Sequence, residues 1–172
     1  MKAAVDGTAA DGDLLHGRTL AKATTVLEQA TYLSRRHSVV VANPPYMGTI
    51  NMGEGLRAFA ELQFRTTYGD LCTMMLERSI GLARSGGYSA IIASESWIFT
   101  SSYEAMREEM LRRTTPLVVA CIDRSAFGVV LNTVATVLHV ASMSQGVGRF
   151  FRVGAEAIAA GVSSLPIPGQ PV

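Results

Sequence analysis

The sequence has little of what a metal site requires. It contains two cysteines, Cys72 and Cys121, and three histidines, His16, His37 and His139. None of these five residues stands at the spacing of metal ligands, so we expect no metal. The two isolated cysteines are typical of buried thiols in a reducing compartment, which indicates a cytoplasmic protein.

Long apolar runs are also missing. Although 48% of the residues are hydrophobic, no run approaches the roughly 18 apolar residues that cross a bilayer. The richest stretches, Leu117–Ile122 and Val134–Val140, have the length of strands. The N-terminus has no apolar segment of the kind found in signal peptides. We therefore expect neither export nor a membrane partner.

An excess of charge of one sign is missing as well. The net charge is only +1, whereas a free-standing DNA-binding domain usually presents a concentrated basic face. The short runs Arg35–His37 and Arg112–Arg113 fit helix ends, where the dipole favours cations. If the protein acts on DNA, most phosphate contacts must come from elsewhere. A glycine fingerprint G-x-G-x-x-G after a strand is also absent, which excludes a generic nucleotide-binding dehydrogenase.

Apolar spacing predicts an alternation of helices and strands. The β-branched run Ser38–Ala42 is typical of a strand buried on both faces, and the two prolines after it end the strand because proline lacks a ladder donor. We expect Asp70 to cap one helix that ends at Gly86–Gly87, and Ser101 or Ser102 to cap another. The predicted helices are Leu20–Arg36, Leu56–Tyr68, Asp70–Ala83 and Tyr103–Arg113, and the predicted strands are Ser38–Ala42, Tyr88–Ala93, Val118–Asp123 and Thr133–Ala141.

This order of elements predicts an α/β fold with a doubly wound sheet that ends in a β-hairpin. Open sheets of this class bind ligands beyond the carboxyl ends of their strands. Asn43 follows one such end and Ser94–Trp97 another, so we expect a site at this edge. From Ser142 onward the pattern weakens, and Leu165–Gly169 has the composition of a linker.

The loop Asn43-Pro44-Pro45-Tyr46 suits methyl transfer to an exocyclic amine. The N6 lone pair of adenine is delocalised into the ring, so the nitrogen is a poor nucleophile. The Asn43 amide oxygen and the Pro44 carbonyl can accept hydrogen bonds from both amino protons and favour the tetrahedral nitrogen of the transition state. The prolines hold these acceptors in place, and Tyr46 offers an aromatic face to an extruded base. A proline turn that ends a strand is the structural alternative.

A longer series of motifs surrounds this loop. The segment Val39–Gly48 resembles motif IV of the amino-methyltransferases, and the whole series is similar to the gamma-ordered adenine-N6 DNA methyltransferases of Type I and Type IIG restriction–modification systems. The later part gives a closer resemblance to the PglX methyltransferases of BREX phage-exclusion systems. The resemblance covers roughly residues 11–141. The segments that carry it after the loop are Gly69–Leu71, Leu76–Arg78, Gly86–Tyr88, Ser94–Glu104, Arg107–Glu108 and Ala126–Gly128.

The resemblance implies the C-terminal part of a Rossmann-like methyltransferase fold, S-adenosyl-L-methionine as cofactor, and an adenine flipped out of double-stranded DNA as substrate. It implies that Asn43 and Pro44 bind the target amine, that Pro45 completes the catalytic loop, and that Tyr46 stacks on the adenine. Phe127 lies where the family often places a second aromatic contact to the base, although a core or loop-anchoring role explains it equally well. The implied role is marking host DNA in restriction–modification or phage defence, with other defence subunits as candidate partners.

Two acidic residues resemble cofactor contacts of the family. Asp13 is similar to the motif III acid that contacts the cofactor adenine, and a surface acid before a helix is at least as good an interpretation. Asp70 fits a residue that shapes the cofactor or base pocket, and a helix cap explains it equally well. Trp97, the one tryptophan, follows a strand end, where packing is the favoured role.

The sequence departs from the family before Asp11, where no Asp-Pro-x-Cys-Gly-Ser-Gly type loop is found to hold the methionine moiety of the cofactor. We expect residues 1–141 to be a partial catalytic domain, with an exposed sheet edge and an exposed apolar face. Residues 142–172 are expected to be a linker or the start of a following segment. The missing cofactor loop predicts a fragment or a truncated gene product. The target-recognition domain that the family resemblance leads us to expect downstream also has no counterpart in the sequence.

Three alternatives remain open at the level of sequence. Protein-glutamine methyltransferases of the release-factor type use the same loop on a side-chain amide, but they normally end soon after their last strands, unlike the tract after Trp97. RNA adenine or guanine methylation is a related alternative. The third is an inactive remnant with a binding role or none, which cofactor binding would distinguish.

Overall fold

The computed structural model describes residues 14–126, 131–143 and 146–156. The chain divides into two units, which meet between Arg36 and His37. The first contains helix α2 (Leu14–Ser34), which confirms the helix predicted at Leu20–Arg36 but begins earlier and ends two residues sooner. Within the described ranges, no helix has the length and apolar character needed to cross a membrane.

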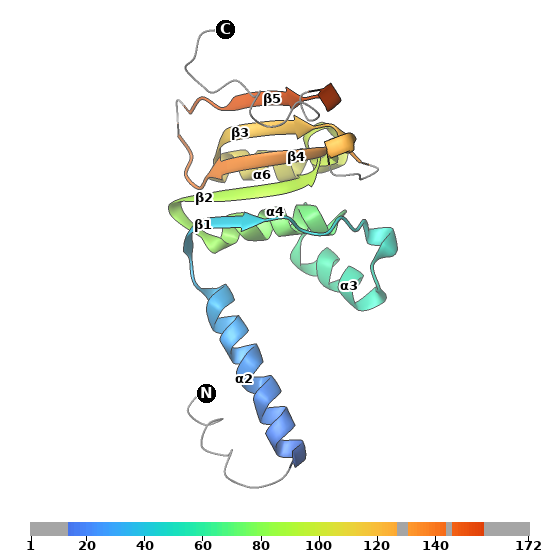
Figure 1. Cartoon of the computed structure of the whole chain (residues 1–172), viewed down its shortest axis with the longest axis vertical. Helices are drawn as coiled ribbons and strands as arrows, with labels where there is room; N and C mark the ends of the chain where they lie inside the picture. The colour runs from blue at the N-terminus through green and yellow to red at the C-terminus, as the bar shows by residue number, and fades with distance from the viewer. Residues whose placement is uncertain (1–13, 127–130, 144–145, 157–172) are drawn as a thin grey trace. The chain divides into compact units, whose positions relative to one another are not determined.

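In its described residues, the second unit is built on a mixed five-stranded sheet with the order β1-β2-β4-β3-β5 (Figure 1). β1 is parallel to β2, β4 is antiparallel to both β2 and β3, and β3 is parallel to β5. The α/β class and the antiparallel pairing of the last two predicted strands are confirmed. The strands are β1 (His37–Ala42), β2 (Ala83–Ser94), β3 (Thr115–Ile122), β4 (Thr133–His139) and β5 (Arg149–Val153).

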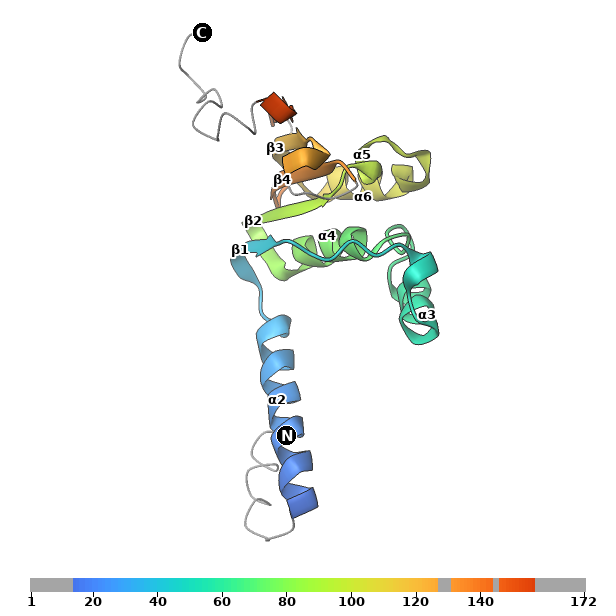
Figure 2. The ribbon, with the colours of Figure 1, turned by 45° about the vertical axis from the view of Figure 1, so that its right-hand side comes forward.

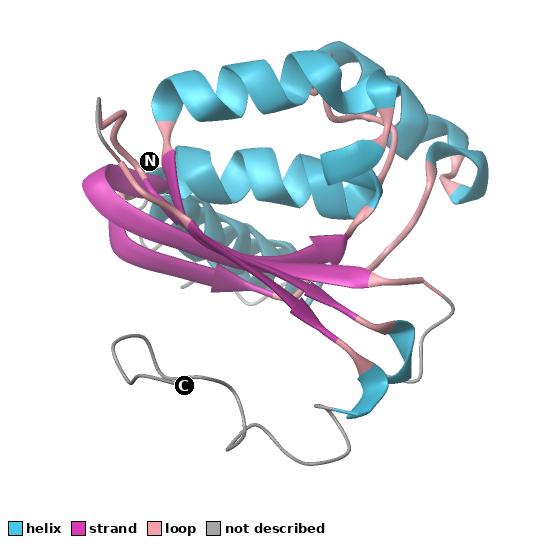
Figure 3. Ribbon diagram, turned by 90° about the horizontal axis from the view of Figure 1, so that it is seen from above, coloured by secondary structure: helices cyan, strands magenta, loops and turns pink. Residues whose placement is uncertain are grey.

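Helices α4 and α6 pack on the same face of this sheet (Figures 2 and 3). α4 begins at the predicted cap, because the Asp70 carboxylate accepts a hydrogen bond from the Cys72 N–H at 2.8 Å. The helices of this unit are α3 (Glu54–Gln63), α4 (Leu71–Leu82), α5 (Ser96–Phe99) and α6 (Glu104–Arg113), with 3₁₀ turns η1 (Thr49–Asn51), η2 (Ser101–Tyr103) and η3 (Arg124–Ala126).

The main core lies between these helices and the sheet. Leu76 from α4 and Leu138 from β4 have no exposed surface, and Trp97 is 3% exposed, which confirms its packing role. The hydroxyls of Ser79 and Ser89 meet within this core at 2.7 Å and satisfy each other. The core residues are Cys72, Leu76, Ile80, Ile91, Ala93, Trp97, Met106, Met110, Val119, Val134 and Leu138.

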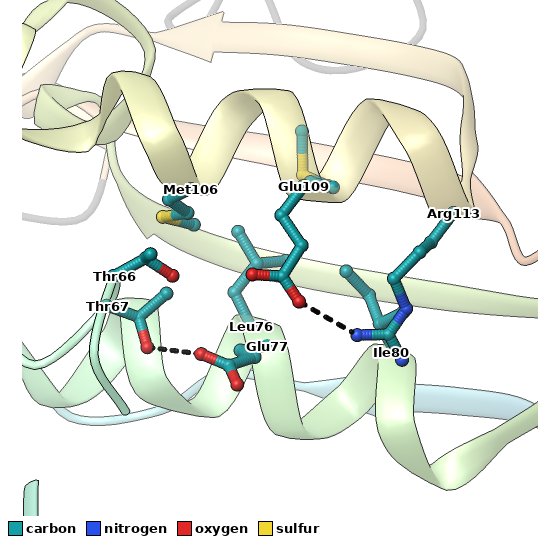
Figure 4. Close-up of a pocket in the computed structure, with 9 residues that line it drawn as sticks. Thr66, Thr67, Leu76, Glu77, Ile80, Met106, Glu109 and Arg113 are labelled. Atoms are coloured by element: carbon teal, nitrogen blue, oxygen red, sulfur yellow. Dashed lines mark hydrogen bonds and ion pairs between the residues drawn. The ribbon is translucent and has the colours of Figure 1, made fainter. Parts of the chain in front are cut away.

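A small pocket opens between α4 and α6 on the outer side of this core (Figure 4). In it the Thr67 hydroxyl donates to the Glu77 carboxylate at 2.5 Å, and the Arg113 guanidinium pairs with Glu109 at 3.4 Å. Its lining includes none of the loop residues 43–46. Because the pocket does not touch the loop, we assign it no part in the site. The exposed Arg113–Glu109 pair adds little stability.

The expectation that Ser38–Ala42 is buried on both faces is wrong. Val39 is 56% exposed and Val41 is 75% exposed, and both lie on the face opposite α4 and α6. The physical reason is that β1 pairs with β2 alone in the described sheet, so one of its edges and one of its faces remain open. Within the described residues, β1 thus presents an open edge and an exposed apolar face.

Gly86 and Gly87 do not end a helix, contrary to the prediction. α4 ends at Leu82, and both glycines lie within β2, beside a shift in the β1–β2 register between His37 and Val39. Gly86 has a φ of 72°, and a Cβ on Gly87 would lie 2.8 Å from the Ser38 carbonyl oxygen. The bulge in β2 therefore requires these glycines. In sequence, a glycine pair is compatible both with the end of a helix and with a bulge in a strand.

Two further helix boundaries differ from prediction. Ser101 and Ser102 form η2 instead of a cap, and α6 begins at Glu104 without a side-chain cap hydrogen bond. The helix predicted to reach Tyr68 ends at Gln63, because the chain turns through hydrogen bonds from the Thr67 and Tyr68 N–H groups to the Phe64 carbonyl. Terminal turns of this kind leave little trace in apolar spacing.

Strand β5 was not predicted, since sequence analysis assigns residues 142–172 to a linker or a following segment. β5 pairs with β3 from Val118↔Arg149 to Ile122↔Val153 and forms the second edge of the described sheet. It is short, its two phenylalanines lie between two arginines, and Phe150 is 70% exposed. An exposed edge strand of this kind lacks the apolar run by which buried strands are predicted.

Candidate functional site

The loop Asn43–Tyr46 leaves the carboxyl end of β1, the position that the sequence predicts. Ala42 is the last residue of β1 and pairs with Ile91 of β2. Asn43 is exposed, and its side chain makes no hydrogen bond within the part of the chain that the structure describes. Pro44 is buried and Pro45 is exposed. The amide oxygen of Asn43 is therefore available to a ligand.

Tyr46 lies at the inner side of the loop. It is partly buried and packs against the main core. Burial raises the pKa of its hydroxyl, and the nearby Cys72 and Asp70 raise that pKa further. The ring is thus a neutral aromatic group held by the core with part of its surface still accessible, as a stacking role requires.

Asp70 ties the segment after the loop to the start of α4. Its Oδ1 accepts the Met47 N–H at 3.2 Å as well as the Cys72 N–H at 2.8 Å. The Leu71 N–H donates to the Met47 carbonyl at 2.9 Å, and Gly48 forms an antiparallel bridge with Asp70. The carboxylate therefore joins two segments in addition to capping a helix.

The turn that presents Asp70 is itself closely packed. The Thr73 hydroxyl donates to the carbonyls of Thr67 and Asp70 at 2.6 and 2.7 Å. Tyr103 from η2 lies over Gly69, where a Cβ would meet its hydroxyl at 2.7 Å. This close approach favours glycine at position 69, because a Cβ there would require the Tyr103 side chain to move. The tract after Trp97 thus supports the turn that contacts the loop segment.

Arg57 helps to hold the turn that follows the loop, a role that the sequence did not reveal. From α3 its Nε donates to the Thr49 carbonyl at 3.2 Å, and its Nη2 lies 3.5 Å from the Ile50 carbonyl and 3.4 Å from the Met52 carbonyl. It thereby holds the turn that follows the loop. An arginine in an amphipathic helix resembles any solvated cation in sequence, and only the fold brings it to these carbonyls.

Further polar groups meet at the same edge of the sheet, at the ends of β2 and β3. The Asn132 amide donates to Glu95 at 2.7 Å, and its oxygen accepts the Arg124 N–H at 3.2 Å. Asp123 accepts the Ser125 N–H at 2.9 Å, which with the hydroxyl of Ser125 lowers the pKa of that carboxyl. The described residues contain no group of His, Cys, Asp or Glu that could hold a metal ion.

Residues 15–127 match the model of the Eco57I restriction-modification methylases. The chain belongs to this family. Among curated proteins it is 37% identical over 120 residues to the adenine-specific methyltransferase BrxX of Escherichia coli O9:H4 (strain HS), and 31% identical over 126 residues to the adenine-specific methyltransferase PglX of Lacticaseibacillus casei (strain Zhang). Each match covers 70% of this chain and 10% of the relative, so the chain spans about a tenth of the length of these Eco57I-type relatives.

Solved structures show the same fold. The chain superposes with a TM-score of 0.60 and 14% identity on the DrdV–DNA complex, over 80% of this chain and 17% of that one. It superposes with a TM-score of 0.56 and 11% identity on a class I S-adenosylmethionine-dependent methyltransferase from Listeria monocytogenes, over 74% of this chain and 41% of that one. The Eco57I-family chain thus has the methyltransferase fold expected from its motifs.

The structure brings together only part of the predicted site of this Eco57I-family chain. Asn43, Pro44, Pro45 and Tyr46 form one loop, and Asp70 lies beside it. Asp13 and Phe127, assigned by resemblance to the cofactor adenine and to the target base, lie outside the described residues. Cys72, adjacent to Asp70, has no exposed surface, and burial raises the pKa of its thiol to about 12, so it remains a packing group.

Proposed function

We propose that this chain carries the target-amine site of a site-specific adenine-N6 DNA methyltransferase that uses S-adenosyl-L-methionine and acts on an adenine flipped out of double-stranded DNA. The observation that carries the proposal is the exposed, unpartnered Asn43 amide at the carboxyl end of β1, followed by two prolines and a half-buried tyrosine. Family membership supports the DNA substrate over the glutamine and RNA alternatives.

The loop acts on the amine by accepting hydrogen bonds from its two N–H groups. One N6 hydrogen donates to the Asn43 amide oxygen and the other to the Pro44 carbonyl, which draws the nitrogen toward tetrahedral geometry and localises its lone pair. That lone pair would attack the electrophilic methyl group that S-adenosylmethionine would supply from its sulfonium when bound, and the surplus N6 proton would pass to solvent water. The prolines fix the acceptors before the base arrives, so little reorganisation is needed. Tyr46 stacks on the flipped ring.

The described residues fit the amine better than they fit the cofactor. S-adenosylmethionine supplies an electrophilic methyl group when it is bound. Asp70, one of the two residues assigned to it by resemblance, uses Oδ1 for two backbone N–H groups, which leaves only Oδ2 for a ligand. The other, Asp13, lies outside the described residues. The residues that hold the amine therefore carry the proposal, and cofactor contacts by Asp13 and Asp70 remain predictions.

The names of the relatives support a proposed cellular role. Both curated relatives are named adenine-specific methyltransferases, and the DrdV structure is a complex with DNA. We place the activity in the cytoplasm, in marking host DNA for restriction–modification or phage defence together with other defence subunits. Since this chain carries a net charge of only +1, most of the contacts to DNA phosphates are assigned to other parts of the enzyme.

The test is to incubate an intact enzyme that carries this chain as its catalytic segment with labelled S-adenosylmethionine and adenine-containing duplex DNA, and to assay the digested nucleosides for N6-methyladenine. Calorimetric titration with S-adenosylmethionine alone measures cofactor binding separately. We expect N6-methyladenine as the product. Methylation of a glutamine-containing peptide or of RNA, without methylation of DNA, would contradict the proposal, and so would cofactor binding without transfer to any adenine in the DNA.

Replacing Tyr46 tests the stacking role. We expect Tyr46→Ala to raise the KM for DNA by about tenfold or more, because stacking of a base on an aromatic ring is worth roughly 1–3 kcal/mol. Tyr46→Phe keeps the ring and should stay near the wild-type value. Steady-state methylation kinetics on duplex DNA measure both variants. An unchanged KM in Tyr46→Ala, or an equal rise in Tyr46→Phe, would contradict stacking.

A further inference from the structure

We propose that Asp70 is a positioning residue that holds the Asn43–Tyr46 loop in place through the Met47 backbone. The inference rests on the proposed function, because it assigns to Asp70 the task of keeping the amine acceptors where that function needs them. It differs from the cofactor contact implied by resemblance, in which the negative charge or an oxygen of Asp70 meets the cofactor directly.

The first step of the argument is the way Met47 is held. Its N–H donates to Asp70 Oδ1 at 3.2 Å, and its carbonyl accepts the Leu71 N–H at 2.9 Å. Both backbone groups of the residue directly after Tyr46 are therefore fixed to the start of α4. The Thr49 N–H adds a bond to the Gly69 carbonyl at 3.2 Å, next to the Gly48–Asp70 bridge.

The second step concerns the opposite end of the loop. Ala42, directly before Asn43, pairs with Ile91 in the sheet. The four residues of the loop thus lie between two fixed points, one in β1 and one at Met47, and two of the four are prolines with restricted φ. Removing the Asp70 bond weakens the second fixed point. The Asn43 oxygen would then sample positions away from the amine, although neither Asn43 nor the sheet has changed.

The third step separates this role from helix capping, which Asp70 also performs. The two bonds share one oxygen, Oδ1, yet they make different demands on the side chain. Serine caps helices about as well as aspartate, but its hydroxyl sits one bond closer to the backbone than Oδ1 and falls short of Met47. Asparagine keeps an acceptor at the Oδ1 position and loses only the charge. Alanine loses both bonds.

The experiment compares Asp70→Asn, Asp70→Ser and Asp70→Ala with the wild-type chain. Amide hydrogen exchange at Met47, followed by NMR, reports the position of the loop segment without any need for turnover. We expect Met47 to be protected in the wild type and in Asp70→Asn, and to exchange at least about tenfold faster in Asp70→Ser and Asp70→Ala. Urea unfolding should place Asp70→Ser near the wild type, with only Asp70→Ala clearly less stable.

Methylation kinetics supply the second readout. The kcat of Asp70→Ser and Asp70→Ala should fall by roughly 10–100-fold, since small displacements of a reacting group carry penalties of that size, while the KM for S-adenosylmethionine stays the same. Asp70→Asn should remain within about threefold of the wild type, because its acceptor is retained.

Other outcomes would contradict either the positioning role of Asp70 or the proposed function. Full activity and Met47 protection in Asp70→Ser would reduce Asp70 to a helix cap and overturn the proposal. A defect in Asp70→Asn as large as that in Asp70→Ala, expressed in the KM for S-adenosylmethionine, would favour a charge-dependent cofactor contact and also overturn it. A protected Met47 amide in the wild-type chain, together with no N6-methyladenine from the intact enzyme that carries it, would refute the proposed function, while the exchange pattern would still establish the anchoring of the loop.

Discussion

Asn43→Ala is expected to lower the kcat for adenine methylation by about 10²–10³-fold, the usual cost of removing one preorganised transition-state hydrogen bond. The Asn43 side chain is exposed and makes no hydrogen bond within the described chain, so its removal should leave the fold intact. Because the proposed role of the amide is to bind the amine and not the cofactor, the dissociation constant for S-adenosylmethionine should not change. Methylation kinetics and calorimetric titration of the variant measure the two effects.

The matched control is Asn51→Ala in η1, which removes an exposed asparagine side chain eight residues further along the chain. It should methylate DNA at the wild-type rate. If Asn43→Ala and Asn51→Ala both retain full activity, Asn43 does not bind the target amine. If Asn43→Ala loses cofactor binding in parallel with activity, the loop serves the cofactor and the assignment to the amine is wrong.

The place of the proposed catalytic loop at the end of β1 could be predicted from sequence because its features are local. Four adjacent residues supply both acceptors, the rigid backbone and the aromatic ring, and the strand before them fixes their place at the sheet edge. The contacts that hold the loop are not local. Arg57 reaches the Thr49 carbonyl, and Asp70 reaches Met47 across 23 positions of sequence. No spacing rule connects such residues, so their roles emerged only from the fold.

The same distinction between local and long-range contacts explains which elements of the fold could be predicted from the sequence. Buried elements with long apolar runs were predicted at nearly the right boundaries, as β4 illustrates. Elements whose structure or burial depends on the strands paired with them were predicted wrongly or missed. Gly86–Gly87 break a strand instead of a helix, β5 exists because β3 offers it an edge, and Val39 and Val41 are exposed because no described strand or helix covers that side of β1. Pairing partners decide these features.

Leu76→Ala is expected to lower the free energy of unfolding by about 2–5 kcal/mol, the range for deleting a fully buried leucine side chain and leaving a cavity. Leu76 has no exposed surface and joins α4 to the sheet within the main core. A loss of this size is a large fraction of the roughly 5–15 kcal/mol that stabilises a typical domain. Urea unfolding followed by circular dichroism measures the change, and the midpoint should fall without a large change in slope.

Leu62→Ala is the matched control, since it deletes the same atoms from a side chain on α3 that is 68% exposed. Its free energy of unfolding should stay within about 0.5 kcal/mol of the wild type. Equal losses in the two variants would mean that α4 is not packed on the sheet in solution. Loss of this packing would also affect the site, because the start of α4 places Asp70 beside Met47. A loose α4 would leave the Asn43–Tyr46 loop fixed only at β1.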